Sequence, residues 1–174
     1  MRLLGTRRLP YGSNAVLASL LVGLALAGCA AKPPPPPVTT PIAMTITAGP
    51  DANPDVNGRS SPITVRVYAF KTTAAFESTD FFTLFDKDTA VLAADTVQRE
   101  EMLLRPGESR KLQMVLPADA KAWGLMGVYR DLDRARWREV RPVEAGKGQI
   151  VTVTVGARQM KIDTVAAPPP APAK

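Results

Sequence analysis

The chain reads Ile63-Thr64-Val65-Arg66-Val67-Tyr68-Ala69-Phe70 at residues 63–70, a run in which small aliphatic side chains alternate with polar or aromatic ones. Successive side chains of a β-strand point to opposite faces of the sheet, so this period of two predicts a half-buried antiparallel strand. The same alternation recurs at 42–48, 111–116, 150–155 and 159–163. Weaker strands are expected at 97–104, 122–129 and 137–140.

Turn residues between these runs support an all-β fold. Pro106-Gly107 fits the central positions of a type II turn, and Gly156-Ala157 is expected to close the last hairpin. Many short strands separated by turn signals predict a two-sheet antiparallel β-sandwich over residues 42–165.

One short helix is expected to interrupt the strands. Ser78 or Thr79 is predicted to be its N-cap, with Asp80 in the first turn. Three apolar side chains, those of Phe81, Leu84 and Phe85, then share one face, and we interpret them as core rather than as a ligand site.

The first 28 residues have the order of a secretory signal. Basic residues at Arg2, Arg7 and Arg8 precede an uncharged apolar run at 15–27, and small residues lead to Cys29. This ending resembles the lipobox of bacterial lipoproteins, in which the chain is cleaved before a cysteine that carries lipid. The alternative is an ordinary signal followed by a chance cysteine.

Cys29 is the chain's one cysteine, and it is the predicted lipidation site. A thioether-linked sulfur is no longer a nucleophile or a metal ligand. Two or more acyl chains give stable membrane anchoring. Ala30 follows, and the absence of an aspartate there favours the outer membrane over the inner one.

Proline-rich segments flank the predicted domain. Residues 29–41 contain five consecutive prolines and are predicted to form an extended tether between lipid and domain. Residues 166–174 form an Ala/Pro tail that is expected to be disordered.

Composition narrows the possible chemistry. Removal of the three signal arginines leaves 19 basic residues against 16 acidic ones, a net charge of +3 that gives no reason to expect nucleic acid as a partner. The chain has no histidine, which excludes serine–histidine and cysteine–histidine catalysis. We therefore expect no enzyme, no bound metal and no cofactor beyond the covalent lipid on Cys29.

Acidic pairs are the remaining catalytic candidates. Neighbouring residues of a strand face opposite ways, so Glu100 and Glu101 are not expected to share a site. Asp51 and Asp55 are interpreted as capping their own loop, with calcium binding as the alternative.

The densest charge cluster is Arg130-Asp131-Leu132-Asp133-Arg134-Ala135-Arg136-Trp137-Arg138. It is interpreted either as a solvated hairpin with paired charges or as a docking surface, since Arg and Trp are favoured at interfaces.

Several motifs together resemble one family. Asn57-Gly58-Arg59-Ser60-Ser61-Pro62, Val65-Arg66-Val67-Tyr68, Asp80-Phe81-Phe82-Thr83-Leu84, Leu104-Arg105-Pro106-Gly107-Glu108 and Gly127-Val128-Tyr129-Arg130-Asp131 follow in order. With the lipobox, this order is similar to that of the TssJ (SciN/VasD-like) lipoproteins of the bacterial type VI secretion system. The resemblance implies a transthyretin-like sandwich on the periplasmic face of the outer membrane. It also implies binding to the periplasmic C-terminal domain of TssM, and through it an indirect link to TssL.

In that family the loop between the first two strands contributes to the TssM contact. The corresponding loop here is 49–62, and the resemblance implies these contact residues: Asp51, Asn53, Asp55, Asn57 and Arg59. Independently, long polar loops on rigid scaffolds often carry function. The alternative is a plain connection whose residues only satisfy turn geometry.

A second possible function is a lipoprotein that binds a small ligand or acts as a chaperone or pilotin. That function predicts a sizeable apolar pocket in the sandwich, whereas the alternation already assigns the apolar residues to the core.

Overall fold

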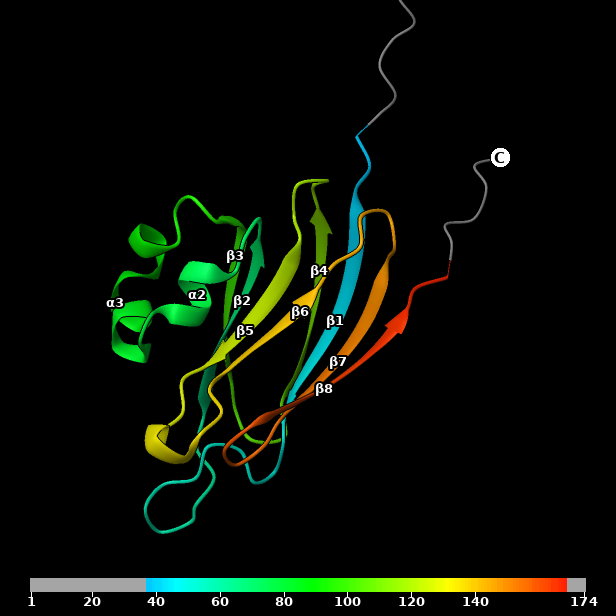
Figure 1. Ribbon diagram of the computed structural model, residues 1–174. Coiled ribbons are helices and arrows are strands. Elements are labelled where there is room, and N and C mark those ends of the chain that lie inside the picture. Colours follow the sequence, from blue (N-terminus) through cyan, green and yellow to red (C-terminus); the bar gives the residue numbers. More distant parts are fainter. Residues whose placement is uncertain (1–36, 169–174) are drawn as a thin grey trace, which may run out of the picture. The chain divides into compact units, whose positions relative to one another are not determined.

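The computed structural model describes residues 37–168 and contains two four-stranded sheets packed face to face (Figure 1). The strand order is β4-β1-β7-β8 in one sheet and β3-β2-β5-β6 in the other. The elements are β1 (Thr40–Ala48), β2 (Ile63–Phe70), α2 (Ala74–Ser78), α3 (Phe81–Val91), β3 (Thr96–Leu104), β4 (Ser109–Leu116), β5 (Ala122–Gly127), the 3-10 turn η1 (Leu132–Arg134), β6 (Arg138–Pro142), β7 (Gln149–Val155) and β8 (Met160–Ala166).

The alternation in the sequence is confirmed as the source of the core. In β1, Ile42, Met44 and Ile46 are buried while the residues between them face outward. Val151 and Val153 repeat the pattern in β7. Trp123 lies between the sheets with no exposed surface, and its indole Nε1 donates to Gln149 Oε1 at 3.0 Å, which ties the second sheet to the first.

The predicted sandwich is confirmed, and its strand pairs are antiparallel with one exception. Strand β1 runs parallel to β7, with Ile42 opposite Gln149 and Ala48 opposite Val155. Parallel neighbours need a long crossover connection. Here the crossover is residues 49–148, which include the whole second sheet, so local strand patterns could not indicate it.

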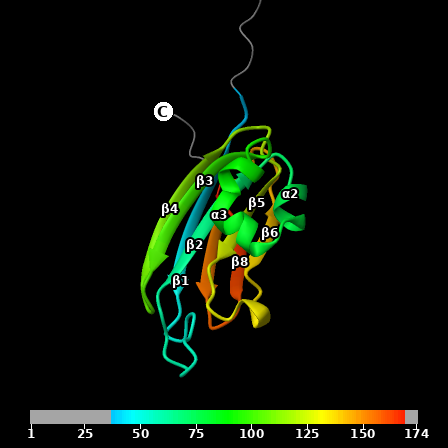
Figure 2. The same cartoon turned by 90° about the vertical axis from the view of Figure 1, so that its left-hand side faces the viewer.

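Strand β2 is buried on both faces, which differs from the predicted half-buried strand. Val65 and Val67 face the other sheet, whereas Tyr68 and Phe70 point outward and are covered by α2 and α3. Figure 2 shows both helices lying over this outer face. The outward aromatic residues of β2 therefore form a second small core with Phe76, Phe81, Leu84, Leu92 and Met126.

The predicted helix start is wrong by one or two residues. Helix α3 begins at Phe81, and Asp80 is its N-cap, because Asp80 Oδ1 accepts from the Thr83 backbone N–H at 3.0 Å. Ser78 belongs instead to α2, a helix that the sequence analysis did not predict, and its hydroxyl donates to the Ala74 carbonyl at 2.8 Å. Phe81 and Leu84 are buried as predicted. Phe85 remains 39% exposed.

The first and last strands extend slightly beyond the expected limits. Thr40 already pairs with Leu116, and β8 continues to Ala166. The predicted signal (1–28), Cys29, most of the tether and most of the tail lie outside the described residues. Within residues 37–168, no helix has both the length and the apolar character that crossing a membrane requires.

The strand directions give the sandwich two distinct ends. We call the end where residue 37 leads into β1 the entry end; it also carries 117–121, 143–148 and residues 167–168 (Figure 1). The opposite loop end carries 49–62, 105–108, 128–137 and 156–159. The nine residues of β1 separate the two ends by about 30 Å.

Candidate functional site

The predicted contact loop, 49–62, projects from the loop end (Figure 1). Its base is closed by backbone hydrogen bonds from Ala52 N–H to the Gly49 carbonyl at 3.1 Å and from Ser61 N–H to the Ala52 carbonyl at 3.0 Å. The loop is therefore a folded projection with its own internal hydrogen bonds.

Asp55 organises the tip of the loop. One of its carboxylate oxygens accepts from the backbone N–H groups of Asn57 and Arg59 at 2.8 and 2.9 Å, and the other accepts from Arg59 Nε at 2.9 Å. The hydrogen bond from the Arg59 backbone, with help from the Arg59 side chain and Asn57, holds the pKa of Asp55 below its usual value. The interpretation that Asp51 and Asp55 cap their own loop is confirmed for Asp55, whereas no hydrogen bond to the Asp51 carboxylate is found within residues 37–168.

Asn53 supports the loop from inside the protein. It is 2% exposed, and its backbone φ is +47°, a left-handed value that Asn tolerates better than most residues. Its side-chain Oδ1 accepts from the Arg130 backbone N–H at 2.8 Å, and its Nδ2 donates to the Pro62 carbonyl at 2.8 Å. Asn53 thus holds the loop to the segment after β5 and presents no surface to a partner.

The other predicted contact residues lie at the surface. Asp51 and Asn57 are exposed, and the Arg59 side chain is 77% exposed although it pairs with Asp55. The structure therefore brings Asp55, Asn57 and Arg59 together at the tip. Asp51 lies at the base of the loop.

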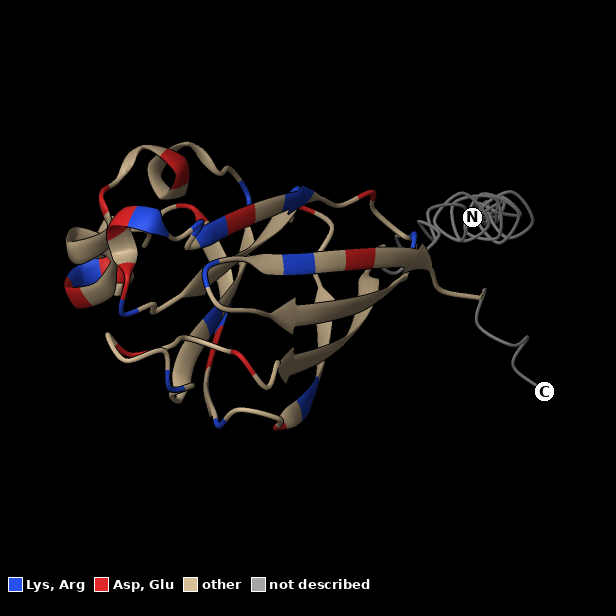
Figure 3. Ribbon diagram, turned by 90° about the horizontal axis from the view of Figure 1, so that it is seen from below, with Lys and Arg blue, Asp and Glu red and all other residues tan. Residues whose placement is uncertain are grey.

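Some residues at or beside the tip are not among the predicted contact residues. Val56 is fully exposed in the turn at 56–57. Arg130, Arg134 and Arg158 come from two other connections and line a hollow of about 920 Å³ together with the tip. Figure 3 views the ribbon from below, the side of the loop end, with Lys and Arg in blue and Asp and Glu in red. The dense charge cluster of the sequence signalled two of these arginines. Their position beside the loop depends on contacts between distant segments.

The charges of this hollow are only partly paired. Asp131 Oδ2 accepts a hydrogen bond from Arg158 Nε at 2.8 Å and forms an ion pair with Arg134, whose Nε lies 3.3 Å away. The hydrogen bond from Arg158 and the charge of Arg134 lower the pKa of Asp131. Among the ion pairs found within residues 37–168, none involves Arg130. Both alternatives for the cluster thus have a basis, since some charges pair while others stay available.

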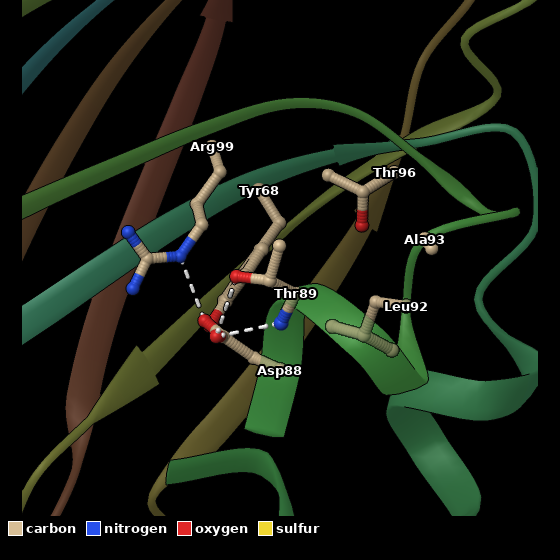
Figure 4. A pocket seen from close by; sticks show the side chains of 7 residues that line it. All are labelled: Tyr68, Asp88, Thr89, Leu92, Ala93, Thr96 and Arg99. Atoms are coloured by element: carbon tan, nitrogen blue, oxygen red, sulfur yellow. Dashed lines mark hydrogen bonds and ion pairs between the residues drawn. The ribbon is translucent and has the colours of Figure 1, made fainter. Parts of the chain in front are cut away.

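A second cluster of polar side chains is buried under α3, between this helix and β3 (Figure 4). Asp88 Oδ2 accepts from the Tyr68 hydroxyl at 2.6 Å, from Arg99 Nε at 2.7 Å and from Arg66 Nη1 at 3.3 Å. Arg66 and Arg99 both pair with Glu101 as well. Burial alone pushes the pKa of Asp88 up, but the bonds from Tyr68 and Arg99 and the charge of Arg66 outweigh it and lower that pKa.

The pocket beside this cluster measures about 310 Å³ and has Leu92, Ala93 and Thr96 among its lining residues. It lies outside the space between the sheets, where the ligand-binding alternative expected it. Asp88 is committed to internal partners, so the cluster is built to hold α3 on the sheet. The Thr96 hydroxyl is the pocket's one buried side-chain oxygen without a partner within the described residues.

Residues 40–158 match the model of a family described as type VI secretion lipoprotein (VasD, EvfM, TssJ). No match was found among curated proteins.

Solved structures give a consistent result. The T6SS lipoprotein TssJ1 from Pseudomonas aeruginosa is similar at 37% identity with a TM-score of 0.70, over 78% of this chain and 100% of that chain. Serratia marcescens Lip, a membrane-bound component of the type VI secretion system, shares the fold at 21% identity and a TM-score of 0.66, over 71% and 97% of the two chains.

A chain in the structure described as "T6SS protein TssM C-terminal domain (869-1107) from EAEC" matches at 26% identity and a TM-score of 0.59, over 70% of this chain and 99% of that one. The family match spans strands β1 to β7, and the match to TssJ1 extends over that protein's entire solved chain. The chain therefore belongs to the TssJ family of type VI secretion lipoproteins.

Proposed function

We propose that this lipoprotein is anchored in the outer membrane through Cys29 and docks the periplasmic C-terminal domain of TssM with its loop end, linking indirectly to TssL. The observation that carries the proposal is the separation of the two ends. The chain enters the sandwich at one end, and the projecting polar loop lies at the other, about 30 Å away.

The anchoring half rests on residues before the sandwich. Cys29 follows a signal-like segment, and the ten residues 30–39 separate it from β1. An extended proline-rich segment of that length reaches roughly 30 Å. Lipid at Cys29 would therefore leave the sandwich free to present its loop end away from the membrane.

The docking half rests on loop 49–62 and on the structural relatives. Chains with this fold occur in structures described as "T6SS protein TssM C-terminal domain (869-1107) from EAEC" and "Type VI membrane complex". A loop held by internal hydrogen bonds loses little further freedom on binding, which favours affinity. The role is structural, with no catalytic step and no cofactor other than the lipid.

Two variants test the two halves. Replacing 54–60 by a Gly/Ser linker of equal length should weaken binding to the TssM periplasmic domain at least tenfold, whereas the same replacement of 144–147 at the entry end should leave the affinity measured by calorimetry unchanged.

Cys29→Ala should release the protein from outer-membrane fractions and abolish type VI secretion. Unchanged affinity of the loop variant, or continued sedimentation of Cys29→Ala with outer membranes, would rule out the corresponding half.

A further inference from the structure

The hollow beside the contact loop has a composition that indicates what kind of surface it fits. Its lining includes four arginines, Arg59, Arg130, Arg134 and Arg158, against the two carboxylates of Asp55 and Asp131. The lining of the hollow therefore carries an excess of two positive charges. We call this hollow, with its four arginines, the arginine hollow.

Both carboxylates are already engaged within the chain. Asp55 is held by Arg59 and by two backbone N–H groups. Asp131 receives Arg134 and Arg158 on the same oxygen, so one negative charge faces two positive ones. The terminal nitrogens of Arg130, Arg134 and Arg158 are consequently available for a further carboxylate, which arginine can bind through two parallel hydrogen bonds.

An apolar side chain stands directly beside this charge. Val56 is fully exposed between Asp55 and Asn57, on a tip closed by hydrogen bonds from Asp55 N–H to the Arg59 carbonyl and from Gly58 N–H to the Asp55 carbonyl. A fully exposed apolar side chain on a hydrogen-bonded tip offers a partner apolar surface to bury, and it stands beside arginines, which are enriched among interface hot spots.

The position of the hollow narrows the choice of anion. It lies at the loop end, about 30 Å from the point where the chain enters the sandwich. If the chain is anchored as proposed, the lipid is attached ahead of residue 37 at the entry end, so the hollow lies on the side of the sandwich away from the attachment. Charge complementarity then favours an acidic protein surface approaching from the opposite side.

We propose that the arginine hollow receives a carboxylate-rich segment of the TssM periplasmic domain while Val56 packs into an adjacent apolar pocket of that partner. This proposal rests on the proposed docking function and adds its chemistry. It assigns Arg130, Arg134, Arg158 and Val56 to the interface.

The test measures affinity of the detergent-solubilised mature lipoprotein for the TssM periplasmic domain at two salt concentrations. Arg130→Glu/Arg158→Glu should weaken binding at least tenfold at low salt. The unmodified protein should lose affinity as the salt rises from about 50 to about 300 mM, and the double variant should lose much less affinity over the same range. Arg130→Glu alone should show a smaller effect of the same sign, and it changes a side chain that makes no ion pair within the described residues.

Val56→Ala should weaken binding roughly tenfold without changing the salt dependence, because it removes buried apolar contact and no charge. The matched control is Lys121→Glu/Lys147→Glu, which makes the same charge change with exposed residues at the entry end. Its affinity should stay within about twofold of the unmodified protein at both salt concentrations.

Two outcomes would overturn the proposal. In the first, the arginine variants bind TssM as tightly as the unmodified protein while the 54–60 replacement still abolishes binding. This result would support the docking function and contradict the proposed role of the arginines. In the second, the arginine variants lose binding to purified peptidoglycan and keep TssM affinity, which would assign the hollow to an anionic glycan. If the 54–60 replacement itself binds normally, the docking function fails instead.

Discussion

Asn53 shows how one residue fixes the geometry of the contact loop. Its left-handed backbone turns the chain, and its side-chain amide joins two segments through the Pro62 carbonyl and the Arg130 N–H. The family resemblance implied Asn53 as a contact residue because it belongs to loop 49–62. Its partner Arg130 lies 77 residues further along the chain, so no local pattern could show that the side chain is buried.

Asn53→Ala is expected to destabilise the protein by about 3 kcal/mol, because it removes both hydrogen bonds and places a Cβ-bearing residue without a compensating polar group at a positive φ. Asn53→Gly loses the same bonds but relieves the backbone strain, so it should be about 1 kcal/mol more stable than Asn53→Ala. Urea unfolding followed by tryptophan fluorescence measures both. If Asn53→Ala unfolds at the wild-type midpoint, Asn53 does not hold the loop.

At the scale of elements, the strands followed from the sequence and the helical layer only in part. Alternation in β1 and β7 reports directly which side chains face the core. The double burial of β2 depends on α2 and α3 covering Tyr68 and Phe70, which alternation cannot reveal. The start of α3 was misplaced because Ser78 and Asp80 are both good capping residues, and only the hydrogen bond to Thr83 distinguishes them.

Asp88 holds helix α3 on the sheet. Its carboxylate accepts hydrogen bonds from Tyr68 and Arg66 of β2 and from Arg99 of β3. Folding lowers the pKa of Asp88 below its ordinary value of 3.8. Its stabilising charge is therefore fully present above that value and is lost as the pH falls through the lower folded pKa.

Asp88→Asn should lower the melting temperature at neutral pH, since it leaves Arg66 and Arg99 without a buried counter-charge, at a cost of about 3 kcal/mol. The difference from wild type should narrow as the pH falls below about 4, because the carboxyl of the unfolded chain then binds a proton, and it should be smallest once the pH has passed the lower folded pKa of Asp88. Thermal unfolding between about pH 2.5 and 7 tests this, with the exposed Asp86→Asn on the same helix as control. A difference that stays constant down to the lowest pH would contradict the assigned role.

At the scale of the whole molecule, the parallel pairing of β1 with β7 and the crossover between them gather four separate connections at the loop end. The sequence indicated the loop 49–62 and the charge cluster as separate features. The order of the strands in the sheets places these two features side by side, together with Arg158 from the last hairpin, and the sequence alone does not show this order. The proposed anchoring and docking functions require only that rigid strands hold the entry end and the loop end apart.

Site-specific photocrosslinking in cells tests this arrangement most directly. A photoreactive residue at position 56 should crosslink to TssM, because Val56 is fully exposed at the tip of the loop end. The same residue at position 147, which is exposed at the entry end, should give no TssM crosslink. Crosslinking to TssM from position 147 with none from position 56 would contradict the proposal that the loop end is the docking surface.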